Sequence, residues 1–354
     1  MNKHESGASP ESQEKMAKIV LHFFRHGEQL KDPDKTDTEY DLSPVGREQA
    51  RKKAETVGDS PNLGQTMAFG SPRKRSQQTA AFAMASEALD TIDGTESLEE
   101  LKKKLQKDVA EGQNYGSKVM VDPRLNFFMD KETPFGKAAY DAFATRKEYL
   151  RFLAEDSDKL AREVKDERGS TYSRQAGGIA EIVQKYIGVL PRWEELVESG
   201  KYNDSKLERF MGSHGGVTES FLLKVIEKTK GVAERDKLVA LMPNGFDFTE
   251  GFDVAVTDQG GGQEPIIHLT YKKMNEKEPE KTFEFDEDLT SGMVDQIIAE
   301  KVVADITYSP KNGWNWDDTH LDLDYNRQFF SSSSSVFGEI CKSLKKKYPN
   351  GPLN

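Results

Sequence analysis

The chain has 354 residues, which is enough for about two domains or for one large domain with insertions. Hydrophobic residues make up 35% and charged residues 31%, so a core can form, but some stretches must be polar insertions or tails. This composition excludes collagen, a coiled-coil rod and a wholly disordered chain. The 50 basic and 61 acidic residues give a net charge of −11, which argues against nucleic acid as a partner.

The apolar runs and the single cysteine bear on location. The longest apolar blocks, Ile19–Phe24 and Ala80–Ala85, are much shorter than the ~18 residues of a membrane-spanning helix, so we expect no membrane partner. The first 17 residues are rich in Ser, Glu and Lys and lack an apolar stretch, which predicts a disordered lead (1–17) and no signal peptide. Cys341 has no second cysteine to pair with, so a cytoplasmic location is the default expectation.

The first predicted strand is Ile19–Phe24, a short run of β-type apolar residues. It stops abruptly at the polar sequence Arg25-His26-Gly27-Glu28, as a buried parallel strand does when it reaches a loop. A charged loop follows. Ser43 and Pro44 then predict the start of a helix, with serine as the N-cap and proline at the first helical position.

The second predicted strand, Thr66–Gly70, leads into another cap-like pair, Ser71 and Pro72. The first turn of the predicted helix then carries three cations: Arg73, Lys74 and Arg75. A helix N-terminus favours acidic groups, so this cluster is unfavourable unless an anion binds there.

The rest of the chain continues the alternation of strands and helices. Strands are predicted at 118–121 and 209–213, and a hairpin is predicted at 252–257 and 266–271 around a glycine run. Helices are predicted at 133–168, 176–198 and 293–304, and directly after His214-Gly215-Gly216. This order predicts an α/β fold, a three-layer αβα sandwich with a mostly parallel central sheet, helical insertions and a C-terminal extension.

Two predicted strands end in histidine motifs, at His26 and His214, and a third leads to Arg75. The carboxyl ends of parallel strands meet at one edge of a sheet, so these side chains are expected to share a pocket with Arg25. Planar guanidinium groups bind phosphate oxygens in pairs, and the backbone N–H groups of the glycines that follow each histidine, Gly27 and Gly215, add donors. A neutral imidazole can attack phosphorus, while the other cationic and hydrogen-bonding groups stabilise the transferring phosphoryl group.

The motifs resemble the histidine phosphatase superfamily, in the phosphoglycerate mutase-like branch. The matching segments, in the family's order, are residues 24–28, 42–50, 71–80 and 212–216. The resemblance implies that His26 is the nucleophile, that Arg25 and Arg75 hold the phosphoryl group, and that His214 is the second pocket histidine. It implies no metal and no cofactor.

The resemblance also defines the expected domains. It covers roughly residues 18–272, a catalytic domain with insertions at about 87–117 and 131–170. Residues 273–354 lie outside it, as a C-terminal extension of uncertain packing. In that extension, the acidic run around His320 has a spacing that fits neither an EF-hand nor a zinc site.

One departure from the family concerns the general acid. Members with a glutamate acid often show Arg-Leu-Asn-Glu after the third strand, whereas this chain has Arg124-Leu125-Asn126-Phe127. Asp130 and Glu132 lie just downstream, and Glu28 follows the first histidine motif, so these three are the candidate acids. Arg73 and Lys74 are expected to be solvated neighbours of the pocket.

These observations predict a cytoplasmic phosphoric monoester hydrolase that acts through a phosphohistidine on His26. Its substrate would be a phosphorylated small molecule or phosphoprotein. Two alternatives stay open: a phosphomutase of the phosphoglycerate mutase type, and a catalytically weak interaction module on the same fold. The sequence does not indicate an oligomeric state.

Overall fold

The structure is a computed structural model, and it describes residues 16–55, 65–85, 92–106, 117–202, 204–260, 262–273 and 282–308. Most of the predicted N-terminal lead lies outside these residues. So do Cys341 and the acidic run around His320.

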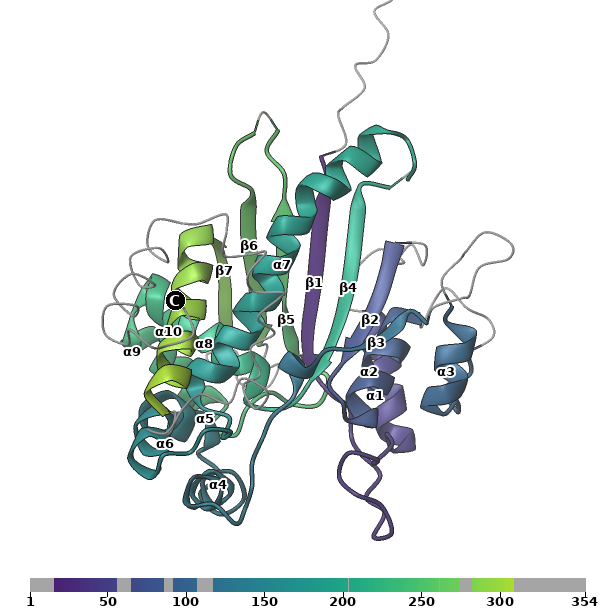
Figure 1. The fold of residues 1–354 in the computed structure, drawn as a ribbon. Coiled ribbons are helices and arrows are strands. Elements are labelled where there is room, and N and C mark those ends of the chain that lie inside the picture. Colours follow the sequence, from purple (N-terminus) through teal and green to yellow (C-terminus); the bar gives the residue numbers. More distant parts are fainter. Residues whose placement is uncertain are drawn as a thin grey trace, which may run out of the picture.

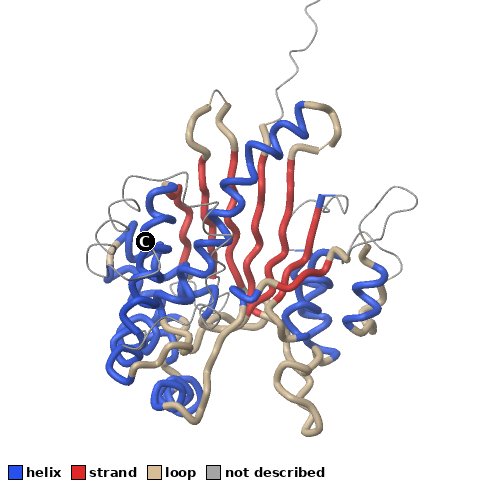
Figure 2. Tube along the Cα trace, viewed as in Figure 1, coloured by secondary structure: helices blue, strands red, loops and turns tan. Residues whose placement is uncertain are grey.

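Seven strands form one mixed sheet in the order β3-β2-β4-β1-β5-β6-β7 (Figures 1 and 2). Their bounds are β1 Lys18–Arg25, β2 Thr66–Gly70, β3 Val119–Val121, β4 Lys206–Ser213, β5 Gly251–Thr257, β6 Ile266–Lys273 and β7 Phe283–Leu289. The first four strands in this order are parallel to one another, and β5, β6 and β7 continue the sheet in antiparallel fashion.

The two halves of the sheet differ in burial, as their sequences predict. Six consecutive residues of β1, Ile19–Phe24, are buried, because this strand lies at the centre of the sheet with helices over both faces. Strands β5 and β6 instead alternate between buried and half-buried residues, which is typical of antiparallel strands with one face on the core.

Helices pack on both faces of the sheet and form two apolar clusters. One cluster joins Phe24 of β1 and Ala68 of β2 to α1 (Pro44–Glu55), α2 (Lys74–Ala85) and α3 (Leu98–Lys104). The other joins Phe23 and the antiparallel strands to α7 (Tyr172–Glu198), α8 (Val217–Lys230), α9 (Val232–Leu241) and α10 (Ser291–Tyr308). Neighbouring side chains of β1 point to opposite faces, so Phe23 and Phe24 enter different clusters.

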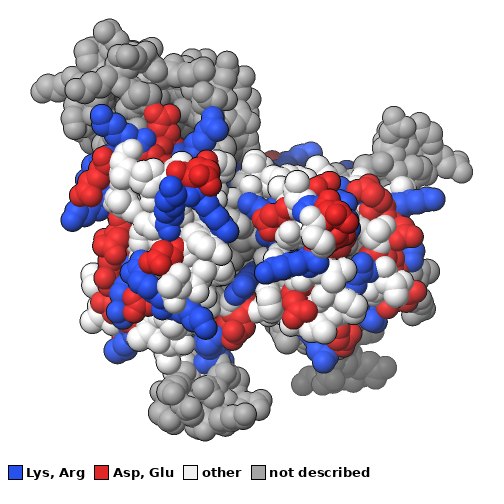
Figure 3. All heavy atoms as spheres, turned by 90° about the horizontal axis from the view of Figure 1, so that it is seen from below, with Lys and Arg blue, Asp and Glu red and all other residues white. Residues whose placement is uncertain are grey.

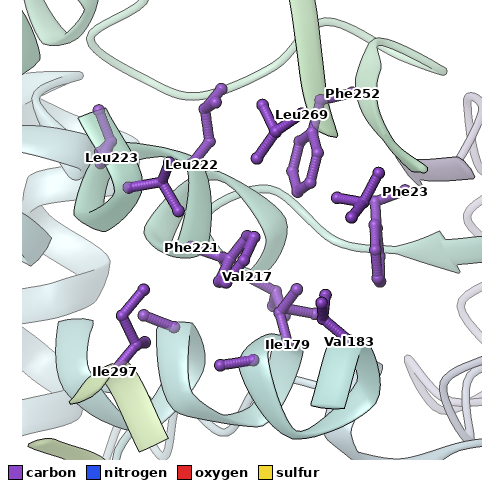
Figure 4. Packing of buried hydrophobic residues seen from close by; sticks show 14 of the residues in the cluster. Phe23, Ile179, Val183, Val217, Phe221, Leu222, Leu223, Phe252, Leu269 and Ile297 are labelled. Atoms are coloured by element: carbon purple, nitrogen blue, oxygen red, sulfur yellow. The ribbon is translucent and has the colours of Figure 1, made fainter. Parts of the chain in front are cut away.

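The larger cluster contains most of the buried apolar side chains in the described residues, and part of it is shown in Figure 4. Phe23 and Phe252 stack on adjacent strands with ring centroids 5.3 Å apart, and Phe221 of α8 stacks on Phe252 at 6.0 Å. Ile179 of α7 and Ile297 of α10 lie in the same cluster. Full burial of each such side chain contributes on the order of 1.5–3 kcal/mol.

The predicted fold class is confirmed, and several local predictions can be compared with it. Ser43 caps α1 as expected, because its Oγ accepts a hydrogen bond of 3.0 Å from the Gly46 N–H. The helix expected over 133–168 is instead broken into α4 (Pro134–Tyr140), α5 (Tyr149–Arg151) and α6 (Asp158–Val164), with π-helical turns between them. A left-handed residue, Lys147 (φ 57°), ends the first π-helical turn, which stops a continuous helix there.

The C-terminal region expected to be an extension begins with elements of the same fold. β7 pairs with β6 along its whole length, and α10 packs against α7. Residues 309–354 lie outside the described part of the chain. Within the described residues, no helix has both the length and the apolar character needed to cross a bilayer.

Candidate active site

The two histidine motifs meet at the carboxyl end of the parallel strands, as the sequence predicts. β1 and β4 lie side by side with Arg25 opposite Ser213, so His26 and His214 follow at the same edge (Figure 1). The His26 N–H donates to the Ser213 carbonyl at 2.9 Å, and the two imidazole rings lie edge to face with centroids 5.0 Å apart. The register of the two parallel strands β1 and β4 therefore brings the two histidine rings into contact.

His26 is buried, and one of its nitrogens is available as a nucleophile. Its Nδ1 lies 2.6 Å from the Gly27 carbonyl oxygen; a carbonyl can only accept, so Nδ1 carries the proton. Nε2 therefore has the lone pair, and it accepts a hydrogen bond of 3.2 Å from the Arg75 Nε–H. Burial, followed by the nearby charges of Arg75 and Arg25, holds the pKa of His26 well below its usual value. The ring is neutral at neutral pH.

His214 is held by a serine hydroxyl. Its Nε2 lies 2.7 Å from the Oγ of Ser71, which also bonds to the Ser76 hydroxyl and accepts from the Arg73 N–H. The helix predicted to start at Ser71 and Pro72 begins three residues later, at Lys74. Ser71 therefore lies in the loop before the helix, where its hydroxyl contacts both His214 and the Arg73 N–H. Burial and the charges around it keep the pKa of His214 well below its usual value.

Arg25 lies beside His26 with one unpaired donor. Its Nη1 donates to the Phe246 carbonyl, and its guanidinium lies over the Phe248 ring, 4.7 Å from the centroid. Its Nε is buried and has no hydrogen-bond partner among the described residues; the same is true of Nδ1 of His214. These two polar atoms at the histidine pair are the groups that an oxyanion would satisfy.

Arg75 is 3% exposed and contacts both His26 and a loop. Its Nη1 donates to the Asp37 carbonyl at 2.5 Å, and its Nη2 donates to the Asp37 carboxylate at 3.3 Å. Burial lowers the pKa of Arg75 to about 10, so the group stays cationic at neutral pH. Asp37, whose side chain is 46% exposed, therefore places an anion on the arginine that was predicted to hold phosphate.

Arg73 belongs to the site, contrary to the expectation that it would be solvated. It forms an ion pair with Asp37, and its Nε donates to Asn126 Oδ1 at 3.0 Å. Its guanidinium lies over the Phe127 ring, 4.1 Å from the centroid. The prediction failed because the partners come from two distant segments, residues 37 and 126–127. The available signal was the run of three cations at the start of α2, from Arg73 to Arg75.

Phe127 lies at the histidine pair. Its ring meets His214 edge to face, with centroids 5.0 Å apart, and it is only half-buried. Phe248 similarly lies 6.1 Å from the His26 ring. An aromatic ring therefore stands beside each histidine.

Two of the three candidate acids accept hydrogen bonds elsewhere, and the third is exposed. Glu28 accepts a hydrogen bond from the Ser43 hydroxyl at 2.8 Å, at the start of α1. Asp130 accepts from the Glu132 N–H at 2.9 Å, in the exposed turn before α4. Glu132 is exposed in the same turn. No contact joins any of the three to His26 or His214 in the described part of the chain.

Gly27 and Gly215, the two glycines predicted to bind phosphate, differ in whether their positions have room for a side chain. A Cβ on Gly27 would lie 2.4 Å from the Gly46 carbonyl oxygen, so glycine permits α1 to approach the histidine loop. The Gly27 N–H donates to the Thr79 hydroxyl at 3.1 Å, and this donor is therefore already paired. Gly215 lies against the Arg25 guanidinium, which a Cβ would contact at 3.6 Å.

Glu219, which the sequence analysis did not select, joins two loops of the site. Its carboxylate is fully buried and accepts from the Gly216 N–H at 2.9 Å and the Phe246 N–H at 2.8 Å. It thereby ties the loop after His214 to the loop whose carbonyl binds Arg25. Burial raises the pKa of Glu219 despite these hydrogen bonds. Glu219 is a positioning residue.

The face onto which β1 and β4 end is seen from below in Figure 3, where basic and acidic side chains are interspersed. Three arginines, Arg25, Arg73 and Arg75, supply positive charge at the histidine pair itself.

The low pKa of His214 predicts how stability changes with pH. An ordinary histidine in the unfolded chain binds a proton below about pH 6.5, whereas buried His214 stays neutral, so acid favours unfolding. Between about pH 7.5 and about pH 5.5 this residue should remove about 1.4 kcal/mol from the free energy of unfolding. Urea unfolding of His214→Asn, measured at both pH values beside the wild type, should show that much less loss of stability in acid. Equal acid sensitivity in wild type and His214→Asn would mean that His214 is charged in the folded protein.

Comparison with known proteins agrees with the motifs. Residues 21–106 match the family model described as Histidine phosphatase superfamily (branch 1). No curated protein matches the sequence. The solved structures that it resembles include a mycobacterial glucosyl-3-phosphoglycerate phosphatase, with 17% identity over 68% of this chain and 91% of that chain and a TM-score of 0.34.

Two further solved structures are a phosphoglycerate mutase from Bacillus anthracis and a putative alpha-ribazole-5'-P phosphatase from Escherichia coli. The first has 13% identity over 80% of this chain and 98% of that chain, with a TM-score of 0.40. The second has 17% identity over 77% and 96%, with a TM-score of 0.31. Likenesses of this size carry no substrate over to this chain. The family model, by contrast, spans both the Arg25-His26-Gly27 motif and Arg75, and confirms that residues 21–106 carry the sequence pattern of the histidine phosphatase superfamily.

Proposed function

We propose that the protein is a phosphoric monoester hydrolase that works through a phosphohistidine on His26. The observation that carries the proposal is the state of His26: a neutral, buried ring whose unprotonated Nε2 lies among Arg75, Arg25 and His214. A neutral imidazole is the form that can attack, and the surrounding donors suit an anionic phosphoryl group.

The reaction has two steps. In the first, the Nε2 lone pair forms a bond to phosphorus as the ester P–O bond breaks, and the leaving oxygen takes the electron pair of that bond. The Arg75 Nε–H stops donating its hydrogen bond to Nε2 of His26 and donates it to a phosphoryl oxygen instead. Arg25 Nε and His214 supply further hydrogen bonds to the phosphoryl group. In the second, water attacks phosphorus, the N–P bond breaks, and its electron pair returns to His26. Inorganic phosphate carries the oxygen of that water, and one water proton passes to the phosphate or to solvent.

Product analysis tests the proposal and separates it from the alternatives. A panel of phosphomonoesters should release inorganic phosphate. Adding an alcohol or a phosphorylated acceptor should not lower the amount released, because the phosphoryl group passes to water. Phosphoryl transfer back to a second substrate in preference to water would favour the phosphomutase. Absence of any turnover across the panel would favour the interaction module. The single cysteine, Cys341, is the ground for proposing that this activity is cytoplasmic.

Asp37 should compete with the phosphoryl group for the arginines, because its carboxylate contacts Arg73 and Arg75. Asp37→Asn removes this charge, so inorganic phosphate should inhibit the variant more strongly, by about two- to five-fold in its inhibition constant, as expected for a half-exposed ion pair. Asp34→Asn, an exposed aspartate of the same loop, is the matched control and should behave as the wild type. Weaker inhibition of Asp37→Asn alone would show that Asp37 instead holds the arginines in their binding positions.

A further inference from the structure

We propose that the site selects phosphomonoesters whose leaving oxygen departs without being protonated, aryl phosphates above all, and that Phe127 imposes this selection. The inference rests on the proposed phosphatase activity and specifies its substrate class. Three features carry it: the apolar group beside His214, the engagement of the nearby carboxylates, and the aromatic surfaces at the histidine pair.

The first feature is the fixed position of Phe127. Its ring is between two groups of the site, edge on to His214 with centroids 5.0 Å apart and under the Arg73 guanidinium at 4.1 Å. Arg73 is itself held by Asn126 Oδ1 and by the Phe127 carbonyl. The segment that follows the short turn Pro123–Leu125 therefore presents to the histidines a ring with no proton to give.

The second feature is that the carboxylates near the site are already engaged as acceptors. Glu28 binds the Ser43 hydroxyl, and Glu219 binds two backbone N–H groups beneath the loops. Asp37 lies between Arg73 and Arg75, and a carboxylate between two guanidinium groups is held in its anionic form, which cannot donate a proton. None of these three carboxyl groups is thus placed to protonate a leaving group.

The third feature is the pair of half-buried rings, Phe127 and Phe248, one beside each histidine. An aryl leaving group can pack against such rings, which contributes binding that an alkyl chain with polar substituents does not obtain. Each ring also carries an arginine, Arg73 or Arg25, at 4.1 and 4.7 Å. The rings are thereby held next to the phosphoryl-binding cations.

The chemistry of the first step then decides the substrate. When the P–O bond breaks, the leaving oxygen takes the electron pair and departs as an oxyanion that takes up a proton from water later. A phenol has a pKa of about 10, so its phenolate departs readily. An aliphatic alkoxide is about as basic as hydroxide and therefore much more basic than a phenolate, so it needs an acid in the transition state. General acid catalysis contributes typically 10²–10⁴-fold, so its absence penalises alkyl esters selectively.

The test measures kcat/KM for aryl phosphates of graded phenol acidity and for alkyl phosphates. The wild type should favour aryl over alkyl esters by about 10³-fold or more, with a rate that rises steeply as the phenol becomes more acidic. Phe127→Glu and Phe127→Gln introduce side chains of nearly the same shape, and only the carboxyl group of the glutamate can act as a general acid. The glutamate variant should therefore hydrolyse alkyl esters about 10- to 100-fold faster than the glutamine variant, with a flatter dependence on phenol acidity.

Controls separate this inference from the proposed function. Phe128→Glu places the same carboxyl group on the next residue, whose side chain is 40% exposed, and should not change the aryl-to-alkyl ratio. Thermal unfolding of both Phe127 variants verifies that they fold. Equal wild-type turnover of both ester classes would overturn the inference and leave the phosphatase intact. A selective loss of alkyl turnover in Asp37→Asn would also overturn it, by identifying a proton donor. Failure of the wild type on every ester would instead reject the proposed function.

Discussion

Replacement of His26 by alanine should reduce phosphomonoester turnover by on the order of 10⁴–10⁶-fold, because loss of a nucleophile removes the whole covalent pathway. The remaining groups, Arg25, Arg75 and His214, can still bind phosphate but cannot form the N–P bond. The folded state should tolerate the change, since the ring follows the end of β1 and its ring neighbours are the site residues His214 and Phe248. Thermal unfolding near neutral pH should therefore be close to that of the wild type.

The same variant tests the intermediate directly. Wild-type protein stopped during turnover should carry phosphate that is labile in acid and stable in alkali, as expected for a phosphohistidine, and His26→Ala should carry none. His268→Ala, at a half-buried histidine of β6 that pairs with Asp286 and Asp288, is the matched control and should retain both the label and the activity. Wild-type turnover without any trapped phosphate would count against the covalent mechanism, and label that persists in His26→Ala would identify another nucleophile.

The central part of the site could be predicted because its geometry follows from strand register. A buried apolar run that stops at Arg25-His26, and another that stops at His214, must bring these side chains together if the two strands are parallel neighbours. The cap at Ser43 and the alternating pattern of β5 and β6 are equally local signals. Each of these predictions needs only a short window of sequence.

The parts that were not predicted depend on contacts between distant segments. Arg73 is in the site because Asp37, on one loop, and Asn126, on another, both bind it. Glu219 joins two loops that follow different elements. The break in the helix expected over 133–168 has a related cause, since the apolar spacing that predicts a helix is also satisfied by short helices and π-helical turns packed on α7 and α8.

Arg75→Lys should weaken transition-state stabilisation by ~2–4 kcal/mol, which is about 30- to 10³-fold in kcat/KM. The guanidinium uses Nε on His26 and Nη1 and Nη2 on Asp37, and it can present two parallel N–H groups to phosphoryl oxygens. An ammonium keeps the charge but has neither the reach nor the planar fork, so a large loss would show that geometry matters beyond charge.

The adjacent helix residue supplies the matched control. Lys74→Arg adds a guanidinium one position away, at the first residue of α2, and should leave kcat/KM unchanged. Because Arg75 is buried and paired with the loop through Asp37, the lysine variant must also be compared by thermal unfolding. A folded Arg75→Lys variant with near-wild-type kcat/KM would place this arginine outside the reacting centre. A rise in KM with kcat unchanged would assign Arg75 to ground-state binding of the substrate. The proposed mechanism requires kcat to fall, because the Arg75 Nε–H changes its hydrogen-bond acceptor from His26 to the phosphoryl oxygen as the bond to phosphorus forms.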